Sequence, residues 1–179
     1  MALKPTIFKF RISLSDTNRD YYDSLQCTIA LHPSETTTRM MARVLAFCLN
    51  AKPELEFTKG LSTIEEPDLW HKALDDTIEH WIEVGEPSLE RVKKATRLAK
   101  RVDIYAFNSK SNVWWSQSQN KMSSYSANIH CFDNQTLEAL AENIDRGMEL
   151  SVMITGNSLF VDSNNGSYEI TWQTLQSND

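Results

Sequence analysis

The stretch from residue 78 to residue 107 constrains the fold of this chain more than any other. Residues 78–84 form an apolar, strand-like run, Ser88 is a good N-cap for a helix expected to run to about Arg101, and residues 102–107 form a second apolar run. Strand, helix and strand in this order make a βαβ unit, whose two strands are parallel and whose crossover is right-handed. The sequence therefore predicts an α/β fold built on a mixed sheet.

The segments on either side of this unit add helices and strands. Apolar and polar residues alternate over residues 7–14, and Tyr21-Tyr22 together with residues 25–31 form a second strand-like run, so the N-terminal part is predicted to be a β-hairpin. Three strand-like runs near the other end, separated by glycine and asparagine turns, predict a C-terminal β-meander. Two more helices are expected, one from a Ser34 cap to Asn50 and one over residues 134–146. The expected class is therefore α/β (α+β), with a mixed sheet flanked by helices.

A length of 179 residues fits one domain better than two. We expect a single domain over residues 1–179, with a core at about 34–107 and flanking segments at 1–33 and 108–179. No run approaches the roughly 20 apolar residues of a membrane span. The first residues lack the apolar core of a signal peptide, so a cytoplasmic location without membrane contact is expected.

Net charge and cysteine usage argue against two classes of function. The formal net charge of −6 argues against a protein that coats nucleic acid, although it allows a local basic groove. The three cysteines form no C-x-x-C pair and the four histidines are scattered, whereas structural zinc needs four ligands at close spacing. We therefore expect reduced, buried thiols and no zinc site.

Two carboxylates stand out as candidates for chemistry. Glu83 interrupts the apolar strand, and a charge there is costly unless it is paired or bound to a metal. Asp68 comes 15 residues earlier, which is enough for a strand, a turn and a return, so both carboxylates can meet at one end of the sheet. Together with the backbone carbonyl of Val84 they would offer the oxygen ligands that Mg²⁺ prefers. Bound Mg²⁺ can activate a water and neutralise a phosphate oxygen.

Basic residues gather on the segment that follows Glu83. On a helical wheel five of them share one arc of roughly 120°, while Val92, Ala95, Leu98 and Ala99 lie on the opposite arc. Such a cationic face would attract the phosphates of nucleic acid. The five residues are Lys93, Lys94, Arg97, Lys100 and Arg101.

Each of these features also has a simpler structural interpretation. Asp68 follows a proline and is typical of a turn or cap. Glu83 can be a structural residue in an ion pair with Arg91, and Glu35 can simply suit the start of a helix. A basic helix in an acidic protein is often just a solvated face.

Five segments together resemble the YaeQ family of small bacterial proteins, over most of the chain and most densely from residue 32 to residue 107. This resemblance implies a variant of the PD-(D/E)XK nuclease fold, with a restriction-endonuclease-like core of a helix, a sheet of about four strands and a second helix. The segments are His32-Pro-Ser-Glu35, Gly60-Leu-Ser62, Glu66-Pro-Asp-Leu-Trp70, Trp81-Ile-Glu-Val-Gly85 and Arg101-Val102.

The resemblance also assigns roles to individual residues. Asp68 matches the motif aspartate, Glu83 matches the motif glutamate, and Glu35 matches an acid on the first helix that can join the metal ligands. The motif lysine, which orients the water and stabilises developing negative charge, falls on Gly85. Losing such a group costs about 10²–10³ in rate. Chain order makes Lys94 the first candidate to replace it, followed by Arg91 and then by the more distant Lys59.

Three functions remain open from the sequence. The first is a Mg²⁺-dependent phosphodiesterase that acts on nucleic acid through Asp68, Glu83 and the cationic face. The second is a nuclease fold without turnover, which binds nucleic acid or has a transcription-related regulatory role. Gly85 and the acidic net charge favour this second function. The third is a protein-interaction module, favoured if Trp114 and Trp115 are exposed, because aromatic residues are enriched at interfaces.

Overall fold

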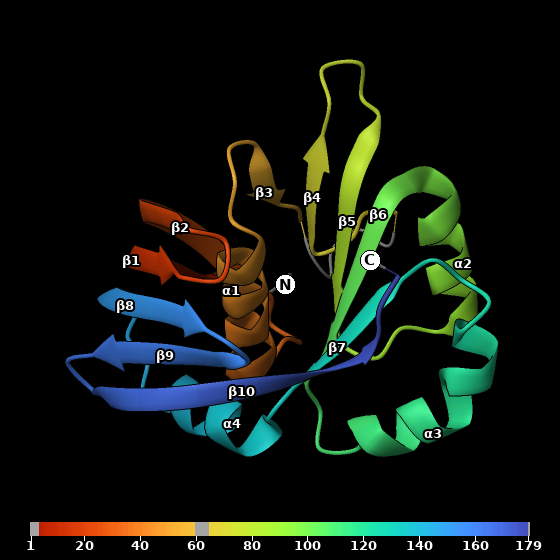
Figure 1. The fold of residues 1–179 in the computed structure, drawn as a ribbon. Helices are drawn as coiled ribbons and strands as arrows, with labels where there is room; N and C mark the ends of the chain where they lie inside the picture. Colours follow the sequence, from red (N-terminus) through yellow and green to blue (C-terminus); the bar gives the residue numbers. More distant parts are fainter. Residues whose placement is uncertain (1–3, 60–64, 179) are drawn as a thin grey trace.

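The computed structural model describes residues 4–59 and 65–178. The Gly60-Leu-Ser62 segment, one of the five that resemble the YaeQ family, lies outside the described residues. Ten strands and four helices are present in the described part of the chain. All ten strands belong to one mixed, nearly closed sheet (Figure 1).

One half of the sheet is built from the two ends of the described chain. An N-terminal hairpin pairs antiparallel, a C-terminal meander follows the order of the chain, and the two are joined because the first strand pairs parallel with the first strand of the meander. The predicted hairpin and meander are thus confirmed, with longer strands than expected. These strands are β1 (Thr6–Asp16), β2 (Tyr21–Leu31), β8 (Gly147–Thr155), β9 (Ser158–Ser163) and β10 (Gly166–Gln176).

The other half of the sheet contains the predicted βαβ unit. Its strands are β3 (Leu55–Phe57), β4 (Leu69–Lys72), β5 (Ile78–Val84), β6 (Ala99–Ala106) and β7 (Asn128–Phe132). Strands β5, β6 and β7 are parallel to one another, which confirms the expected crossover. Strand β10 pairs with both β9 and β7 and so joins the two halves, giving the order β2-β1-β8-β9-β10-β7-β6-β5-β4-β3.

The helices lie on both sides of the curved sheet (Figure 1). They are α1 (Thr37–Asn50), α2 (Leu89–Leu98), α3 (Ser111–Met122) and α4 (Asn134–Ala141). The sheet curves around α1, whereas α2 and α3 pack on the outer face against Trp81, Val102 and Ile104. No helix in the described part of the chain is long and apolar enough to cross a membrane.

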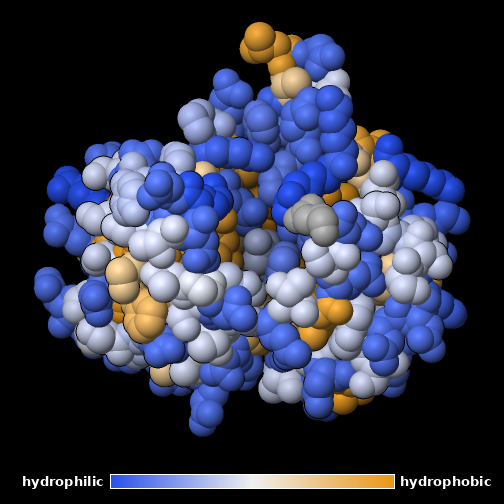
Figure 2. Space-filling view, viewed as in Figure 1, coloured by the Kyte–Doolittle hydropathy of each residue, from blue (hydrophilic) through white to orange (hydrophobic). Residues whose placement is uncertain are grey.

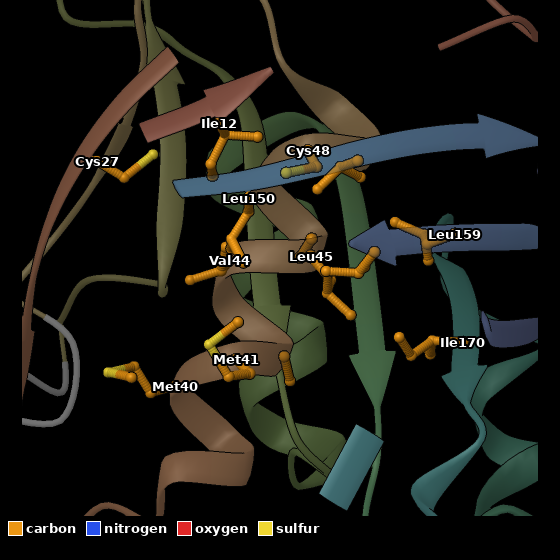
Figure 3. Packing of buried hydrophobic residues seen from close by; sticks show 14 of the residues in the cluster. Ile12, Cys27, Met40, Met41, Val44, Leu45, Cys48, Leu150, Leu159 and Ile170 are labelled. Carbon is orange, nitrogen blue, oxygen red and sulfur yellow. The ribbon is translucent and has the colours of Figure 1, made fainter. Parts of the chain in front are cut away.

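Helix α1 forms the centre of the larger core. Because strands surround it, its side chains are buried on several sides rather than along one stripe, and Figure 3 shows them beside side chains of β1, β8 and β9. This packing fixes the helix axis and therefore where its first turn meets the ends of β4 and β5. The buried apolar residues of α1 are Met40, Met41, Ala42, Val44, Leu45, Ala46 and Cys48.

Three helix boundaries differ from the sequence-based expectation. The cap of α1 is Thr36, whose side chain accepts from the Arg39 N–H, so Glu35 precedes the helix instead of opening it. Helix α4 ends at Ala141 rather than near residue 146. Helix α2 ends at Leu98, because the residues from Ala99 onward pair with β5, and tertiary pairing overrides helix propensity.

The early end of α2 corrects the predicted cationic face. Lys93, Lys94 and Arg97 lie on α2, but Lys100 and Arg101 belong to β6. The five cations therefore do not share one helical arc.

Candidate functional site

A pocket of about 510 Å³ lies where β5 ends and α2 begins. It contains both predicted acids and the predicted carbonyl, because β4 and β5 are antiparallel neighbours and the N–H that precedes β4 donates to the carbonyl of Ile82. The lining residues that matter for its chemistry are Glu35, Arg39, Glu66, Asp68, Glu83, Val84, Glu86 and Arg91.

Asp68 is 4% exposed and each of its carboxylate oxygens has a partner. Its Oδ2 accepts from the backbone N–H of Val84 at 2.8 Å. Its Oδ1 accepts from Nη2 of Arg39 at 2.7 Å. The aspartate is thus fixed to the end of β5 and neutralised by a cation from the first turn of α1.

Arg39 is the functional residue that sequence reasoning missed. Its Nη1 donates to Glu35 Oε2 at 2.7 Å, and its Nη2 also donates to the carbonyl of Val84 at 3.2 Å. Although burial lowers the pKa of Arg39, the charges and hydrogen bonds of Asp68 and Glu35 raise it overall. The guanidinium therefore contacts two of the oxygen atoms that the sequence assigned to Mg²⁺. Its spacing of four residues from Glu35 was the signal that could have identified it.

A second arginine, Arg43, forms an ion pair with Glu35. Arg43, which is buried, donates to Glu35 through Nε at 2.9 Å and through Nη2 at 2.7 Å. The same Nη2 donates to the carbonyl of Ala30 at 3.1 Å. Arg43 thus links α1 to β2 and fixes Glu35, which in turn orients Arg39.

Glu83 is 6% exposed and pairs with the other cation of the pocket. Its Oε1 accepts from Trp81 Nε1 and from Arg91 Nε, each at 2.9 Å. Arg91 also donates from Nη2 to the carbonyl of Glu66 at 2.8 Å. Burial raises the pKa of Glu83, the hydrogen bond from Arg91 opposes this, and the charge of Asp68 adds to the increase.

Gly85, at the position where the resemblance would place a lysine, has a backbone conformation that suits glycine. Gly85 has a φ of 117°, a conformation that strongly favours glycine, and its N–H donates to the carbonyl of Tyr105 at 2.8 Å. Arg91 lines the pocket, whereas Lys94 does not and instead pairs with Glu65 at 2.7 Å with its side chain 43% exposed. Lys59 is also absent from the pocket lining, and its N–H donates to Glu66 at 3.4 Å.

The donor set of the pocket fits a hard divalent cation in one respect and conflicts with it in another. Five carboxylates and two guanidinium groups line the pocket, so negative charge is in excess. One of the five, Glu86, is turned to the next loop, where it accepts from the N–H of Asn108 at 2.9 Å. However, Asp68 Oδ1 and the Val84 carbonyl contact Arg39, so a metal could use both atoms only after Arg39 withdraws. Among residues 4–59 and 65–178 no group of three or more His, Cys, Asp or Glu side chains is arranged to hold a metal.

The two neighbouring tryptophans do not form an exposed aromatic patch. Trp114 and Trp115 are partly buried against the cluster between α2, α3 and the sheet. Trp114 Nε1 also donates to the carbonyl of Pro87 at 3.2 Å. The main argument for a protein-interaction module is therefore weakened.

Comparisons with known proteins agree on one family. The family described as YaeQ protein matches residues 1–172. An uncharacterized YaeQ protein of Salmonella typhi is 36% identical over 97% of this chain and 98% of its own length, and that of Escherichia coli is 35% identical over the same shares. The crystal structure of YaeQ from Xanthomonas axonopodis pv. citri has a TM-score of 0.93 at 34% identity, covering 97% of this chain and 99% of that one. YaeQ from Pseudomonas syringae has a TM-score of 0.92 at 36% identity, covering 97% of both chains. The chain therefore belongs to the YaeQ family.

Proposed function

We propose that this protein is a divalent-metal-dependent phosphodiesterase that acts on nucleic acid, with a single domain built on a restriction-endonuclease-like core of the PD-(D/E)XK type. The observation that carries the proposal is the convergence of Asp68, Glu83, the Val84 carbonyl and the Arg91 guanidinium in one pocket. The order α1, β3 to β5, α2 and β6 supports the proposed core, because it follows the order of helix, strands and second helix expected for it.

The metal in this proposal is Mg²⁺, held by Asp68, Glu83 and the carbonyl of Val84. The excess of carboxylates in the pocket supports it, because uncompensated negative charge attracts a cation. Glu35 is not among the proposed ligands, because its carboxylate oxygens already accept from Arg39 and Arg43. Bound there, Mg²⁺ would supply a Lewis acid that activates water and neutralises a phosphate oxygen.

Arg91 takes the role of the missing lysine in the proposal. Hydrogen bonds to Glu83 and to the Glu66 carbonyl hold its guanidinium at the edge of the pocket. From there its positive charge stabilises the negative charge that develops on the phosphate during hydrolysis. Arg91→Gln is expected to lower the cleavage rate by about 10²–10³.

Arg39 acts as a competitor of the metal in the proposal. Its guanidinium and a divalent cation need the same oxygen atoms, Asp68 Oδ1 and the carbonyl of Val84. Metal binding therefore includes the withdrawal of Arg39, which can keep its bond to Glu35.

Calorimetric titration with Mg²⁺ and Mn²⁺ tests the proposal. The wild type is expected to bind, Asp68→Asn to lose binding, and Arg39→Gln to bind more tightly because a competing cation is gone. Glu149→Gln, which removes an exposed carboxylate far along the chain in β8, is the matched control and should bind like the wild type. Absence of binding to the wild type, or equal binding by the wild type and Asp68→Asn, would refute the proposed metal site.

A second candidate function is a nucleic-acid-binding module without turnover. The specific observation in its favour is that arginines neutralise both carboxylates, Asp68 through Arg39 and Glu83 through Arg91. The exposed Lys93 on α2, with Arg97 one turn later, would then contact phosphates.

Salt-dependent binding and cleavage assays separate the two functions. The module predicts binding that weakens with salt, is reduced in Lys93→Gln and Arg97→Gln, and is unchanged in Lys121→Gln on α3. It also predicts no cleavage of any nucleic acid. Metal-dependent cleavage that disappears in Glu83→Gln would instead support the phosphodiesterase.

A further inference from the structure

A second pocket, of about 380 Å³, lies beside the acidic pocket at the same edge of the sheet. It is formed where the parallel strands β6 and β7 end, between the starts of α3 and α4 and the middle of β10. Its size is within the range of about 300–1,000 Å³ that is usual for ligand sites. The lining residues that matter for its chemistry are Asn108, Asn112, Asp133, Thr171, Trp172 and Gln173.

The second pocket adjoins the acidic pocket. Asn108 lines both of them. Glu86, which lines the acidic pocket, accepts from the N–H of Asn108 at 2.9 Å and from the hydroxyl of Ser111, which lines the second pocket. One residue thus separates a group bound in one pocket from a group bound in the other, so a single ligand can occupy both.

The lining of the second pocket favours an uncharged ligand group. Within residues 4–59 and 65–178 no lysine, arginine or histidine lines it. Its carboxylate, Asp133, caps α4 and accepts from the N–H and the hydroxyl of Thr136 at 3.1 and 2.8 Å. Figure 2 shows mainly hydrophilic and intermediate residues, in blue and white, over the part of this face where Figure 1 draws β10, α3 and α4. The pocket therefore suits a polar group without charge, whereas the acidic pocket contains Arg91.

Three polar side chains of the second pocket are available to a ligand. Asn112, Thr171 and Gln173 are exposed. In the part of the chain that the structure describes, neither the two amides nor the hydroxyl forms a hydrogen bond with the protein. Because an amide both donates and accepts, Asn112 and Gln173 can pair with the donors and acceptors on the edge of a nucleobase.

Trp172 adds an aromatic ring to these polar groups. It is partly buried against the larger core and lines the pocket with its remaining surface. Its indole N–H has no protein partner among the described residues, whereas those of Trp70, Trp81 and Trp114 each donate to a protein oxygen. Stacking of a base on an aromatic side chain contributes as much to binding as one or two hydrogen bonds.

We propose that the second pocket binds a nucleobase of a single-stranded nucleic acid, stacked on Trp172 with its edge against Asn112 and Gln173. The inference rests on the proposed phosphodiesterase, because the phosphate next to this base would lie in the acidic pocket. A nucleotide joins an uncharged base to an anionic phosphate, just as the two pockets adjoin. In a duplex the base is paired and stacked, so the substrate class is single-stranded nucleic acid.

NMR of the tryptophan indole N–H signals tests the base site on the whole protein. Adenosine, cytidine and ribose are added separately in the absence of metal, and Trp172→Phe identifies the signal of Trp172. The nucleosides are expected to shift that signal saturably, and ribose is not. The absence of a saturable shift with either nucleoside, or an equal shift with ribose, would overturn the proposal. An equal shift with ribose would mean that the pocket binds a sugar.

Binding of a labelled single-stranded oligonucleotide, followed by fluorescence anisotropy in EDTA, tests the individual residues. Asn112→Ala is expected to weaken binding about 2–10-fold, the loss expected for one neutral hydrogen bond. Asn120→Ala, which removes another exposed amide of α3, is the matched control and should bind like the wild type. Trp172→Leu should weaken binding about tenfold or more. The comparison of the two asparagines remains valid if Trp172→Leu does not fold, because both amides are exposed.

The same measurements separate this inference from the proposed function on which it rests. Equal binding by Asn112→Ala and Asn120→Ala, or a duplex bound as tightly as the single strand, would overturn the base site. Loss of nucleoside binding together with normal Mg²⁺ binding would overturn the base site alone. Nucleoside binding by a protein that does not bind Mg²⁺ would overturn the phosphodiesterase and support the base site.

Discussion

Replacing Arg39 with glutamine gives the sharpest prediction, because one guanidinium forms ion pairs with two buried carboxylates, Asp68 and Glu35. Glutamine keeps much of the length of the side chain and an amide donor, but it removes the charge. Asp68 and Glu35 are both buried, and breaking a buried ion pair costs about 3–5 kcal/mol. Asp68 retains the Val84 N–H and Glu35 retains Arg43, so we expect a loss at the lower limit, about 3 kcal/mol.

Urea denaturation measures this loss directly. With an m-value of about 2 kcal/mol/M, a loss of about 3 kcal/mol lowers the midpoint by about 1.5 M. If a divalent cation takes the place of the guanidinium, Mg²⁺ should restore stability to the variant. At about 100 times its dissociation constant, a ligand specific for the folded state contributes about 2.7 kcal/mol, which is close to the whole loss.

Urea denaturation with and without Mg²⁺ also tests whether Arg39 occupies a cation site. Mg²⁺ should raise the midpoint of Arg39→Gln by more than that of the wild type, because in the wild type Arg39 must first withdraw. Arg97→Gln removes an exposed cation of α2 and should leave both midpoints unchanged. An Arg39→Gln variant as stable as the wild type, or one that Mg²⁺ does not stabilise, would show that Arg39 does not occupy a cation site.

Three further predictions concern other parts of the molecule. Hydrogen bonds from His130, His80 and Arg101 outweigh burial and lower the pKa of Asp103 below its usual value of 3.8, so its contribution to stability is present above that pH and is lost as pH falls below it. Asp103→Asn should therefore cost about 3–5 kcal/mol at pH 7, and it should show a smaller loss of stability than the wild type between pH 4 and pH 3 in urea titrations. Met41→Ala in the centre of α1 should lower the free energy of unfolding by about 2–5 kcal/mol in thermal or urea denaturation, because it leaves a cavity in the core. Gly85→Lys should lower it by about 1–3 kcal/mol, because lysine is strained at the positive φ of this position, and it should not restore the function of a motif lysine.

Local sequence patterns were sufficient to predict those parts of the fold that depend on residues close together in the sequence. Alternation predicted the hairpin and the meander, and the order of strand, helix and strand predicted the parallel pairing of β5 with β6. The convergence of Asp68 and Glu83 followed from the short return between β4 and β5. The pairing of β1 with β8, which aligns Lys9 with Gly147, has no local signature because it joins residues from the two ends of the chain.

The cation of the pocket shows where chain order is a poor guide. Lys94 and Arg91 are three residues apart and therefore lie on nearly the same face of α2. However, Lys94 is about 4.5 Å farther along the helix axis, and the pocket lies at the first turn. Arg91, whose N–H is bonded by the Ser88 cap, thus reaches Glu83, whereas Lys94 reaches Glu65. Arg39 was missed for a related reason, since its spacing from Glu35 can indicate an ion pair with that residue but does not place the first turn of α1 beside Asp68.

Strand β5 separates the acidic pocket from the buried ion-pair cluster around Asp103. His80 and Glu83 belong to the same strand but are three residues, about 10 Å, apart, and an odd spacing directs their side chains to opposite faces of the sheet. His80 faces Asp103 and Lys52, whereas Glu83 faces Trp81 and Arg91, so within residues 4–59 and 65–178 these hydrogen bonds go to different partners. Substitutions that are this far apart without shared partners normally have additive effects. Asp68→Asn combined with Asp103→Asn should therefore lower the free energy of unfolding by about the sum of the two separate losses in urea denaturation, and a combined loss that differs clearly from this sum would show that the two groups are coupled through the sheet.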